Sequence, residues 1–308
     1  MYAGMAGALW GMVLMVPELL PEFNPLLLAS VRYLMLGIIS LLMAVPMARQ
    51  LRSLTLVDAW MLLRLAVIGN LVYFICLAAA IQHLGVAPTS LIVGILPLTI
   101  TLYGRNDTGA VPLSRLLGPL ALILAGMLCI NLEAFAFAPG AVGEKVVGLF
   151  YAVAALACWT WYATHNSRCL KRSGHFDSHQ WSVLCGIMTG LSSLVMVAAL
   201  AIWQPHQLQV DAPMQRWWLF WACALGCAVF GSWLALAFWN AASRLLPLTL
   251  SGQLIVFETL FALLYAFLWR QSGPSLLEGI AIVLVIGGVL WSMRQHGPSR
   301  TLAKPVRS

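Results

Sequence analysis

The chain has 308 residues, of which 61% are hydrophobic and only 9% charged, and its mean hydropathy is +0.90. Soluble domains carry about 25% charged residues. This chain therefore has too little polar surface for a water-facing globule, which excludes a soluble enzyme and a disordered chain. Its apolar runs are long and continuous, unlike the short alternating segments of an outer-membrane barrel. The composition predicts an all-α polytopic membrane protein.

The net charge of +7 does not indicate a nucleic-acid partner, because the 17 lysines and arginines are scattered in small groups between apolar runs. The seven cysteines include no CxxC pair, which argues against a metal site and a disulfide framework. The sequence motifs GxxxxGK[ST], HExxH and GxSxG are missing. We therefore expect no catalytic residue, metal or cofactor, and no ATP-driven transport by this chain.

Membrane-spanning helices are predicted from runs of about 20 mainly apolar residues. Proline, glycine and charge clusters divide the chain into ten such runs, at about 2–20, 25–48, 58–83, 87–104, 114–133, 146–168, 178–203, 217–243, 247–269 and 275–293. The first run is the weakest, because Pro17 and Glu18 interrupt it. It has no basic n-region and no small-residue cleavage site, so we expect a retained helix rather than a cleaved signal peptide.

The basic residues predict the orientation of these ten spans. With the N-terminus inside, thirteen lysines and arginines fall on the cytoplasmic side and three, Lys145, Arg216 and Arg270, on the outer side. Cytoplasmic loops of membrane proteins carry an excess of basic residues. We therefore expect both termini to be cytoplasmic.

The second half of the chain repeats the first. Matches at a slowly drifting offset pair the following residues: Trp10 with Trp159, Gly37 with Gly190, Tyr73 with Trp233, Thr89 with Thr249, and Gly126 with Gly287. Five is an odd number of spans, so the second copy enters the membrane from the opposite side. The sequence thus predicts two inverted five-helix repeats at 1–136 and 144–296, a connecting loop at 137–143, and a basic cytoplasmic tail at 297–308. Inverted repeats are typical of carriers that work by alternating access.

Several short motifs resemble the EamA family of the drug/metabolite transporter superfamily. They are Leu9-Trp10-Gly11, Arg32 in the second run, and the segment from Ala87 to Pro97. Segments 69–74, 158–163 and 254–260 are similar to the bacterial inner-membrane YtfF-type branch of that family. The resemblance implies a secondary carrier of small organic solutes in the bacterial cytoplasmic (inner) membrane. It also implies a central cavity between helices 1–4 and 6–9, with helices 5 and 10 peripheral. The ninth run departs from the family's aromatic-amino-acid exporters by carrying Glu258.

Glu258 is the main candidate for binding or coupling. It has no other Asp, Glu, Lys, Arg or His within ten positions on either side, and a carboxylate at the bilayer centre costs at least about 2.5 kcal/mol. Either it binds a substrate ammonium group or carries a proton, or it is a structural strut. Gln253 lies on the same run and is a further polar candidate. Asn70, near the middle of the third run, either contacts substrate or makes an interhelical hydrogen bond.

Arg32 and Pro97 are candidates with alternatives. Arg32 either neutralises a substrate carboxylate or snorkels outward with a structural role. Pro97 leaves a backbone carbonyl free in the fourth run, and its counterpart in the ninth falls at Phe257 or Glu258, so a kink and a carboxylate share one depth. Two further glycine pairs are expected close-packing points, namely Gly7 with Gly11 and Gly287 with Gly288.

Five aromatic residues are expected near mid-membrane depth: Trp10, Tyr73, Trp159, Tyr162 and Trp233. An interfacial aromatic belt does not account for aromatic residues at that depth. They either line a cavity wall or fill the core.

These features predict a secondary transporter that exports a small organic metabolite, an amino acid or a derivative. Expected partners are the small-molecule substrate, the lipid bilayer and a coupled proton if Glu258 titrates, and we expect a functional monomer. The alternatives are a lipid or lipid-linked flippase, favoured if a cavity opens sideways, and a non-transporting membrane enzyme or partner subunit. A single midplane carboxylate is a poor start for acid–base catalysis.

Overall fold

The computed structural model describes residues 1–13, 15–51, 53–84, 86–135, 142–172, 176–271 and 273–296. Most of the expected connecting loop, residues 137–141, and the whole expected tail, 297–308, lie outside the described residues. Within the described ranges every regular element is a helix, and no strand is present.

The first half of the chain forms the following helices: α1 (Tyr2–Val13), α2 (Val16–Leu19), α3 (Pro25–Ala44), η1 (Val45–Met47), α4 (Ala48–Leu51), α5 (Leu56–Ala66), η2 (Val67–Val72), α6 (Tyr73–Leu84), α7 (Val86–Val93), α8 (Leu96–Tyr103) and α9 (Leu113–Phe135). The element η1 is a 3-10 turn, and η2 is a π-helical segment that continues α5 into α6. Local capping begins two of these helices. The Asn24 side chain accepts from the amide of Leu26 over 2.8 Å at the start of α3, and Thr55 and Asp58 form a capping box at the start of α5.

The second half forms α10 (Val142–Arg172), α11 (Ser178–Trp203), η3 (Pro205–Leu208), α12 (Met214–Gly226), η4 (Cys227–Leu234), α13 (Ala235–Leu245), α14 (Leu248–Leu254), α15 (Phe257–Arg270) and α16 (Leu276–His296). The element η4 is a second π-helical segment, which joins α12 to α13. A capping box of Asp177 and Gln180 begins α11.

Seven helices of the described structure are long and apolar enough to cross a membrane: Leu26–Met47, Leu56–Leu84, Lys145–Arg172, Ser178–Trp203, Met214–Leu245, Leu248–Trp269 and Leu276–His296. Helix Leu113–Cys129 is apolar but shorter. The expected class, a helical membrane protein, is thereby confirmed. The runs expected at 2–20 and 87–104 are each divided into two short helices, and α2 and α8 both carry a proline in their first turn. The count of ten spans stays a prediction.

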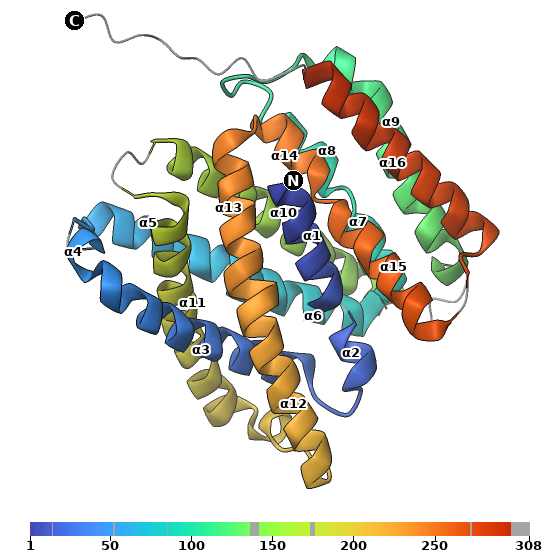
Figure 1. The fold of residues 1–308 in the computed structure, drawn as a ribbon. Helices are drawn as coiled ribbons and strands as arrows, with labels where there is room; N and C mark the ends of the chain where they lie inside the picture. Colours follow the sequence, from blue (N-terminus) through green and yellow to red (C-terminus); the bar gives the residue numbers. More distant parts are fainter. Residues whose placement is uncertain are drawn as a thin grey trace, which may run out of the picture.

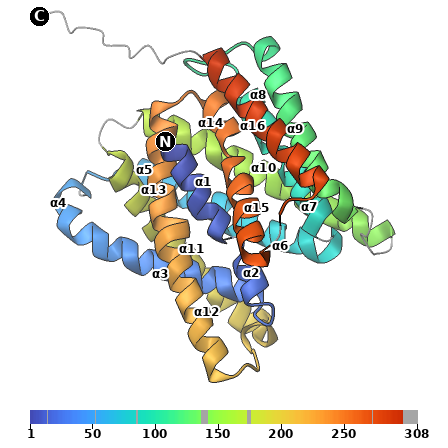
Figure 2. The ribbon, with the colours of Figure 1, turned by 45° about the vertical axis from the view of Figure 1, so that its right-hand side comes forward.

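The helices are arranged around α1. Helix α1 lies between α13 and α15, with the segment from α12 to α13 running the length of the molecule beside it (Figure 1). Helices α9 and α16 lie side by side at one edge, and a turned view shows the same arrangement (Figure 2). Helix α3 packs on α11, α6 on α10, and α8 on α14.

Glycines allow the closest of these contacts. A Cβ added at Gly37 of α3 would lie 2.7 Å from the Cα of Gly190 in α11, so the two backbones touch where the repeat comparison pairs them. At Gly288 in α16 an added Cβ would lie 2.8 Å from the carbonyl of Pro119 in α9. The expectation for Gly287 is wrong, because a Cβ added there would meet nothing within 4 Å. Consecutive residues of a helix point about 100° apart, so only one of the pair faces α9.

Candidate functional site

Glu258 stands directly after a break in the helix path. It is the second residue of α15, and its amide donates to the carbonyl of Ile255, three residues back, over 3.1 Å. The break between α7 and α8 repeats this pattern: Pro97 is the second residue of α8, and the amide of Leu98 donates to the carbonyl of Ile95 over 2.9 Å. Pro97 explains the break between α7 and α8, because proline lacks an N–H. No proline stands at the break between α14 and α15. Glu258 and Pro97 occupy the same position in the two broken helices.

Two glycines of α1 allow its backbone to contact the start of α15. A Cβ added at Gly7 would lie 2.9 Å from the amide nitrogen of Glu258, and one added at Gly11 would lie 2.8 Å from that of Ala262. Real Cβ atoms essentially never come this close to a neighbour. Helix α1 therefore reaches the backbone of α15 because these two positions lack side chains, which confirms the close packing expected of Gly7 and Gly11.

Glu258 interacts electrostatically with Arg32 of α3 and with Tyr73 at the start of α6. Between the two described side chains, however, no nitrogen of Arg32 lies within 4.0 Å of a Glu258 oxygen. Both side chains are half-buried. Arg32 and Glu258 therefore form no direct ion pair.

Arg32 is held by its neighbour in sequence. Its Nη2 donates to the hydroxyl of Tyr33 over 2.8 Å, and the guanidinium carbon lies 4.6 Å from the centre of the Tyr33 ring. Its Nε is buried and has no hydrogen-bond partner among the residues that the structure describes. One donor of this cation is therefore unused.

Four of the five expected aromatic residues lie together around Trp159. Its ring centroid lies 6.1 Å from that of Trp10, 6.2 Å from Tyr73 and 5.1 Å from Tyr162. Sequence reasoning missed a fifth member, Trp239 of α13, whose ring lies 6.3 Å from Trp159 and 5.4 Å from Trp10. We call these five residues the aromatic cluster. Tyr73, which belongs to the cluster, also interacts electrostatically with Glu258 and Arg32.

Trp233 does not join the aromatic cluster, although the sequence comparison of the two halves pairs it with Tyr73. It packs against the buried group of Ala29, Tyr33 and Leu36, and its ring centroid lies 6.3 Å from that of His179. Its indole nitrogen is buried without a hydrogen-bond partner in the described structure.

Asn70 and Gln253 both make structural hydrogen bonds. The Asn70 amide, in η2, donates to the hydroxyl of Thr189 in α11 over 2.9 Å, which is the interhelical bond that the sequence left open as one alternative. Gln253 is fully buried in α14, and its amide donates to the carbonyl of Thr249 over 3.1 Å. Its Oε1 has no partner within the described ranges.

A buried polar network that sequence reasoning missed joins α10, α11 and α13. The Asn166 amide donates to the side-chain oxygen of Asn240 over 2.8 Å, and the Asn240 amide donates to the Ser182 hydroxyl over 2.8 Å. The indole of Trp181 donates to the side-chain oxygen of Asn166 over 2.8 Å. All four side chains are buried, so the network fixes these three helices to one another.

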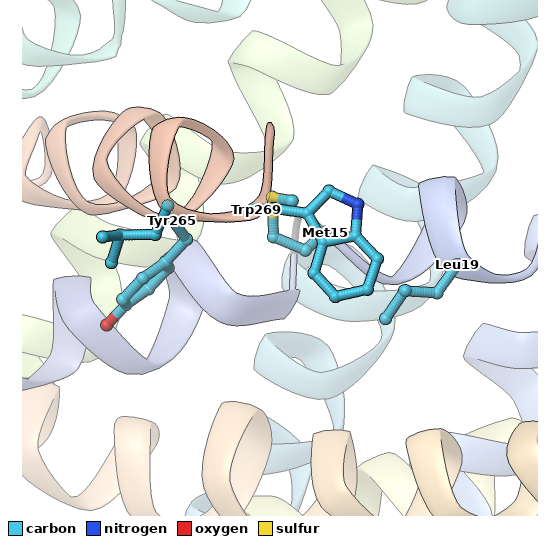
Figure 3. Close-up of a pocket in the computed structure, with 5 residues that line it drawn as sticks. Met15, Leu19, Tyr265 and Trp269 are labelled. Carbon is cyan, nitrogen blue, oxygen red and sulfur yellow. The ribbon is translucent and has the colours of Figure 1, made fainter. Parts of the chain in front are cut away.

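Two apolar pockets lie near the N-terminal helices, one between α2 and α15 and one between α1 and the segment from α12 to η4. The first, of about 260 Å³, is lined by Met15, Leu19, Tyr265, Leu268 and Trp269 (Figure 3). The second, of about 190 Å³, is lined by Leu9, Met12, Val13, Val16, Cys223, Gly226, Cys227, Phe230 and Gly231. Neither is lined by Glu258 or by the aromatic cluster, so neither is the central cavity that the family resemblance implied. Their apolar walls suit hydrocarbon rather than a charged group.

Two ion pairs join the first half of the described chain to the second. Asp107, after α8, accepts from Nε and Nη2 of Arg168 in α10, each over 3.0 Å. Glu22, before α3, accepts from Nε and Nη2 of Arg216 in α12, the latter over 2.9 Å. The hydrogen bonds from Arg216 hold the pKa of the Glu22 carboxyl below its ordinary value. Both pairs are bidentate, the geometry in which Arg and carboxylate bind best.

Comparison with known proteins agrees with this fold. The EamA-like transporter family matches residues 1–132 and 146–294. The chain is similar to the inner membrane protein YtfF of Escherichia coli (strain K12), with 34% identity over 99% of this chain and 98% of that protein. A crystal structure of a protein at 18% identity matches with a TM-score of 0.76 and covers 95% of each chain. That structure supports the fold alone.

Proposed function

Since the chain belongs to the EamA-like transporter family, we propose that it is a secondary transporter that moves a small organic metabolite across the bacterial cytoplasmic membrane. The solute that we propose is an amino acid or a close derivative, and the direction is export. One observation carries the proposal: a carboxyl residue, Glu258, stands at a helix break, with its backbone packed against Gly7 and Gly11 of α1, and interacts electrostatically with Arg32 and Tyr73. The family and the relative point to a transporter rather than an enzyme.

Alternating access requires two halves that can exchange conformations, and we assign these to five-helix repeats at 1–136 and 144–296. The two matched stretches of the family support this division. Contacts between α3 and α11 and between α9 and α16 each join a helix to its repeat counterpart, and the contact between α8 and α14 joins the fourth and ninth runs, as expected near a twofold axis. Equivalent breaks at Pro97 and Glu258, and equivalent π-helical segments η2 and η4, add to the support.

We place both termini on the cytoplasmic side. Three polar contacts support this orientation by gathering expected cytoplasmic loops at one end: Arg168 with Asp107, Lys171 with the carbonyl of Leu246, and Arg244 with the carbonyl of Phe176. Helix α1 begins and α16 ends near this same end (Figure 1). The Glu22–Arg216 pair then lies at the opposite, outer end.

Within this scheme Glu258 binds the ammonium group of the substrate or carries the coupled proton. A carboxylate inside a membrane protein faces the bundle interior, where it is protonated or paired. Inverted repeats within one chain supply both halves of a carrier, so we propose that the monomer is functional.

The decisive experiment compares the medium of cells that overproduce the wild type with that of cells that overproduce Glu258→Gln at equal membrane level, by untargeted mass spectrometry. We expect a metabolite enriched with the wild type and not with the variant. The matched control is Glu278→Gln, because Glu278 only caps α16, accepting from the amide of Ser275 over 2.7 Å. Enrichment with all three proteins would keep the exporter and make Glu258 structural. Enrichment with none would count against export.

The two apolar pockets favour a second candidate, a lipid or lipid-linked flippase. Both are lined by hydrophobic side chains such as Met12, Phe230 and Trp269, which are exposed on the protein surface. Such surfaces hold acyl chains in a bilayer. The test is flipping of a fluorescent phospholipid in proteoliposomes, read by quenching of the outer leaflet with dithionite. Flipping above that of empty vesicles would favour this candidate over a carrier of water-soluble metabolites.

A further inference from the structure

We propose that the second pocket, between α1 and the segment from α12 to η4, binds a soft monovalent metal ion of the Cu(I) class. The ligands are the thiols of Cys223 and Cys227, with the thioether of Met12 as a third, weaker ligand. Neither Glu258 nor a member of the aromatic cluster lines this pocket. The inference therefore goes beyond the proposed function and does not depend on which solute is transported.

Sulfur supplies all the side-chain ligands that this pocket offers. The pocket has a volume of about 190 Å³, and its lining includes Cys223, Cys227 and Met12. The other lining residues are aliphatic, aromatic or glycine: Leu9, Val13, Val16, Gly226, Phe230 and Gly231. Hard cations such as Mg²⁺ and Ca²⁺ take oxygen ligands, whereas thiolate and thioether sulfur select Cu(I). The lining residues therefore favour a soft ion.

The two thiols lie on one face of a single helical turn. Cys223 and Cys227 are four residues apart, and the amide of Cys227 donates to the carbonyl of Cys223. Side chains at this spacing are neighbours, with Cβ atoms about 5–6 Å apart. Both thiols are free, and Cys227 is 5% exposed whereas Cys223 is partly buried. Two sulfur atoms so placed can bind one ion from opposite sides, an arrangement that Cu(I) accepts. The absence of a CxxC pair therefore does not prevent this helix from binding a metal ion.

Helix α1 brings the third sulfur to the pocket from the first half of the chain. A Cβ added at Gly231 of η4 would collide with the side chain of Val13, so α1 and η4 pack directly against each other beside the pocket. Met12 precedes Val13 and is 41% exposed. Its unbranched thioether side chain adapts readily to a neighbour. An ion in this pocket would thus contact residues of both halves.

A monovalent ion fits the membrane surroundings of this pocket. Both cysteines lie in the apolar helix Met214–Leu245, which is long enough to cross a membrane, and a net charge at membrane depth is costly. On binding, one thiol releases its proton to water and its thiolate bonds to the ion, while the other thiol donates a lone pair. The complex of one cation and one thiolate has no net charge. Structural Zn²⁺ sites take four ligands, and the lining of this pocket offers three.

The test is a titration of the purified full-length protein in detergent with Cu(I), without oxygen, in competition with the coloured chelator bicinchoninate. We expect the wild type to hold one Cu(I) more tightly than its other thiols do. Cys223→Ala and Cys227→Ser should each weaken this Cu(I) at least about tenfold, because even residues that only support a metal ligand contribute about 10- to 100-fold. Met12→Leu keeps the side-chain volume and should weaken Cu(I) by less than either cysteine variant.

The matched control is Cys129→Ala, because Cys129 is also free and partly buried but lines neither pocket. It should bind Cu(I) as the wild type does. Cys223→Ala keeps the test informative if Cys227→Ser does not fold, since Cys223 is the less buried of the two. Unchanged affinity in Cys223→Ala would overturn the inference, and so would an equal loss in Cys129→Ala. X-ray absorption at the copper edge should show sulfur neighbours alone, and nitrogen or oxygen neighbours would contradict a site in this pocket.

Discussion

Glu258 is a carboxyl residue in a membrane-spanning segment, and its contacts indicate what role it has. A carboxylate at the bilayer centre costs at least about 2.5 kcal/mol, and here Gly7 and Gly11 of α1 pack against the backbone of Glu258. Arg32 and Tyr73 interact electrostatically with its side chain. A purely structural carboxylate would be expected to form a direct bond, and no bond to a described residue is present. This arrangement favours a role with a ligand or a proton.

If Glu258 carries the coupled proton, its replacement removes the pH dependence of transport. We expect the flux of the wild type in proteoliposomes to change with the pH gradient, and the flux of Glu258→Gln to be independent of it, because an amide cannot titrate. The measurement is uptake of the identified metabolite over a series of imposed gradients. Glu278→Gln should behave as the wild type. An unchanged pH profile in Glu258→Gln would remove this residue from proton coupling.

At the scale of the helices, the breaks and π-helical segments decide which side chains reach the site. Both η2 and η4 interrupt long helices, and each is followed directly by α6 or α13, which carry Tyr73 and Trp239. An extra residue in a helical turn rotates everything after it relative to a regular helix. The aromatic cluster therefore depends on these two irregular turns as much as on the positions of its residues in the sequence.

Features of the site that are encoded by a single residue or by local spacing could be predicted from the sequence, and features set by tertiary contacts could not. Pro97 predicts a break from its own chemistry, because it lacks an N–H. The break before Glu258 has no such residue, and Trp239 lies beyond a π-helical segment that periodicity does not show. The close contacts of Gly7 and Gly11 were predicted from their spacing, but Gly287 was not distinguished from its neighbour, since the identity of the facing helix is a tertiary property. Span positions therefore follow from local composition, and the members of the site do not.

The contact of α1 with α15 gives a test at this scale, because α1 contains one glycine inside the contact, Gly7, and one outside it, Gly4, which serves as the control. An added Cβ at Gly7 would lie 2.6 Å from the Cβ of Phe257, whereas one at Gly4 meets nothing within 4 Å. Overpacking costs about 1–3 kcal/mol, and alanine stabilises a helix over glycine by about 0.5–1 kcal/mol. We expect Gly7→Ala to lower the thermal unfolding midpoint in detergent and to reduce transport. Gly4→Ala should leave both equal or raise the midpoint, and equal effects at the two sites would contradict the close contact.

On the scale of the whole molecule, two ion pairs tie the first half of the described chain to the second, and the contribution of the Glu22–Arg216 pair depends on pH. The pKa of Glu22 is held below its ordinary value by Arg216. A carboxyl whose pKa is lower in the folded state contributes stability above its unfolded pKa and loses it as the pH falls through the folded value. We expect the difference in unfolding midpoint between the wild type and Glu22→Gln to be present at pH 7. It should shrink as the pH falls below about 4.3, the ordinary pKa of a glutamate. A difference that is undiminished at pH 3 would mean that Glu22 acts through packing.

The two ion pairs also allow a prediction of how opening at one end of the carrier is coupled to closure at the other. If the halves rock against each other, Asp107–Arg168 must open when the cytoplasmic side opens, and Glu22–Arg216 when the outer side opens. The Asp107–Arg168 side chains are 22% and 31% exposed, and partly exposed pairs contribute about 0.2–1 kcal/mol. Loss of one pair should therefore shift the equilibrium between the two states by about 1.4- to 5-fold.

Cys169 can report this shift, because it is partly buried and follows Arg168 directly in α10. In a variant that keeps this cysteine alone, Asp107→Asn should speed its labelling from the cytoplasmic side by a thiol reagent, since the cytoplasmic end opens more often. Glu22→Gln should slow the same reaction, because it favours the state that is open at the other end. If the two ends of the carrier are coupled, the two variants should change the labelling rate of Cys169 in opposite directions. A change of the labelling rate in the same direction in both variants would mean local loosening and would contradict alternating access through these contacts.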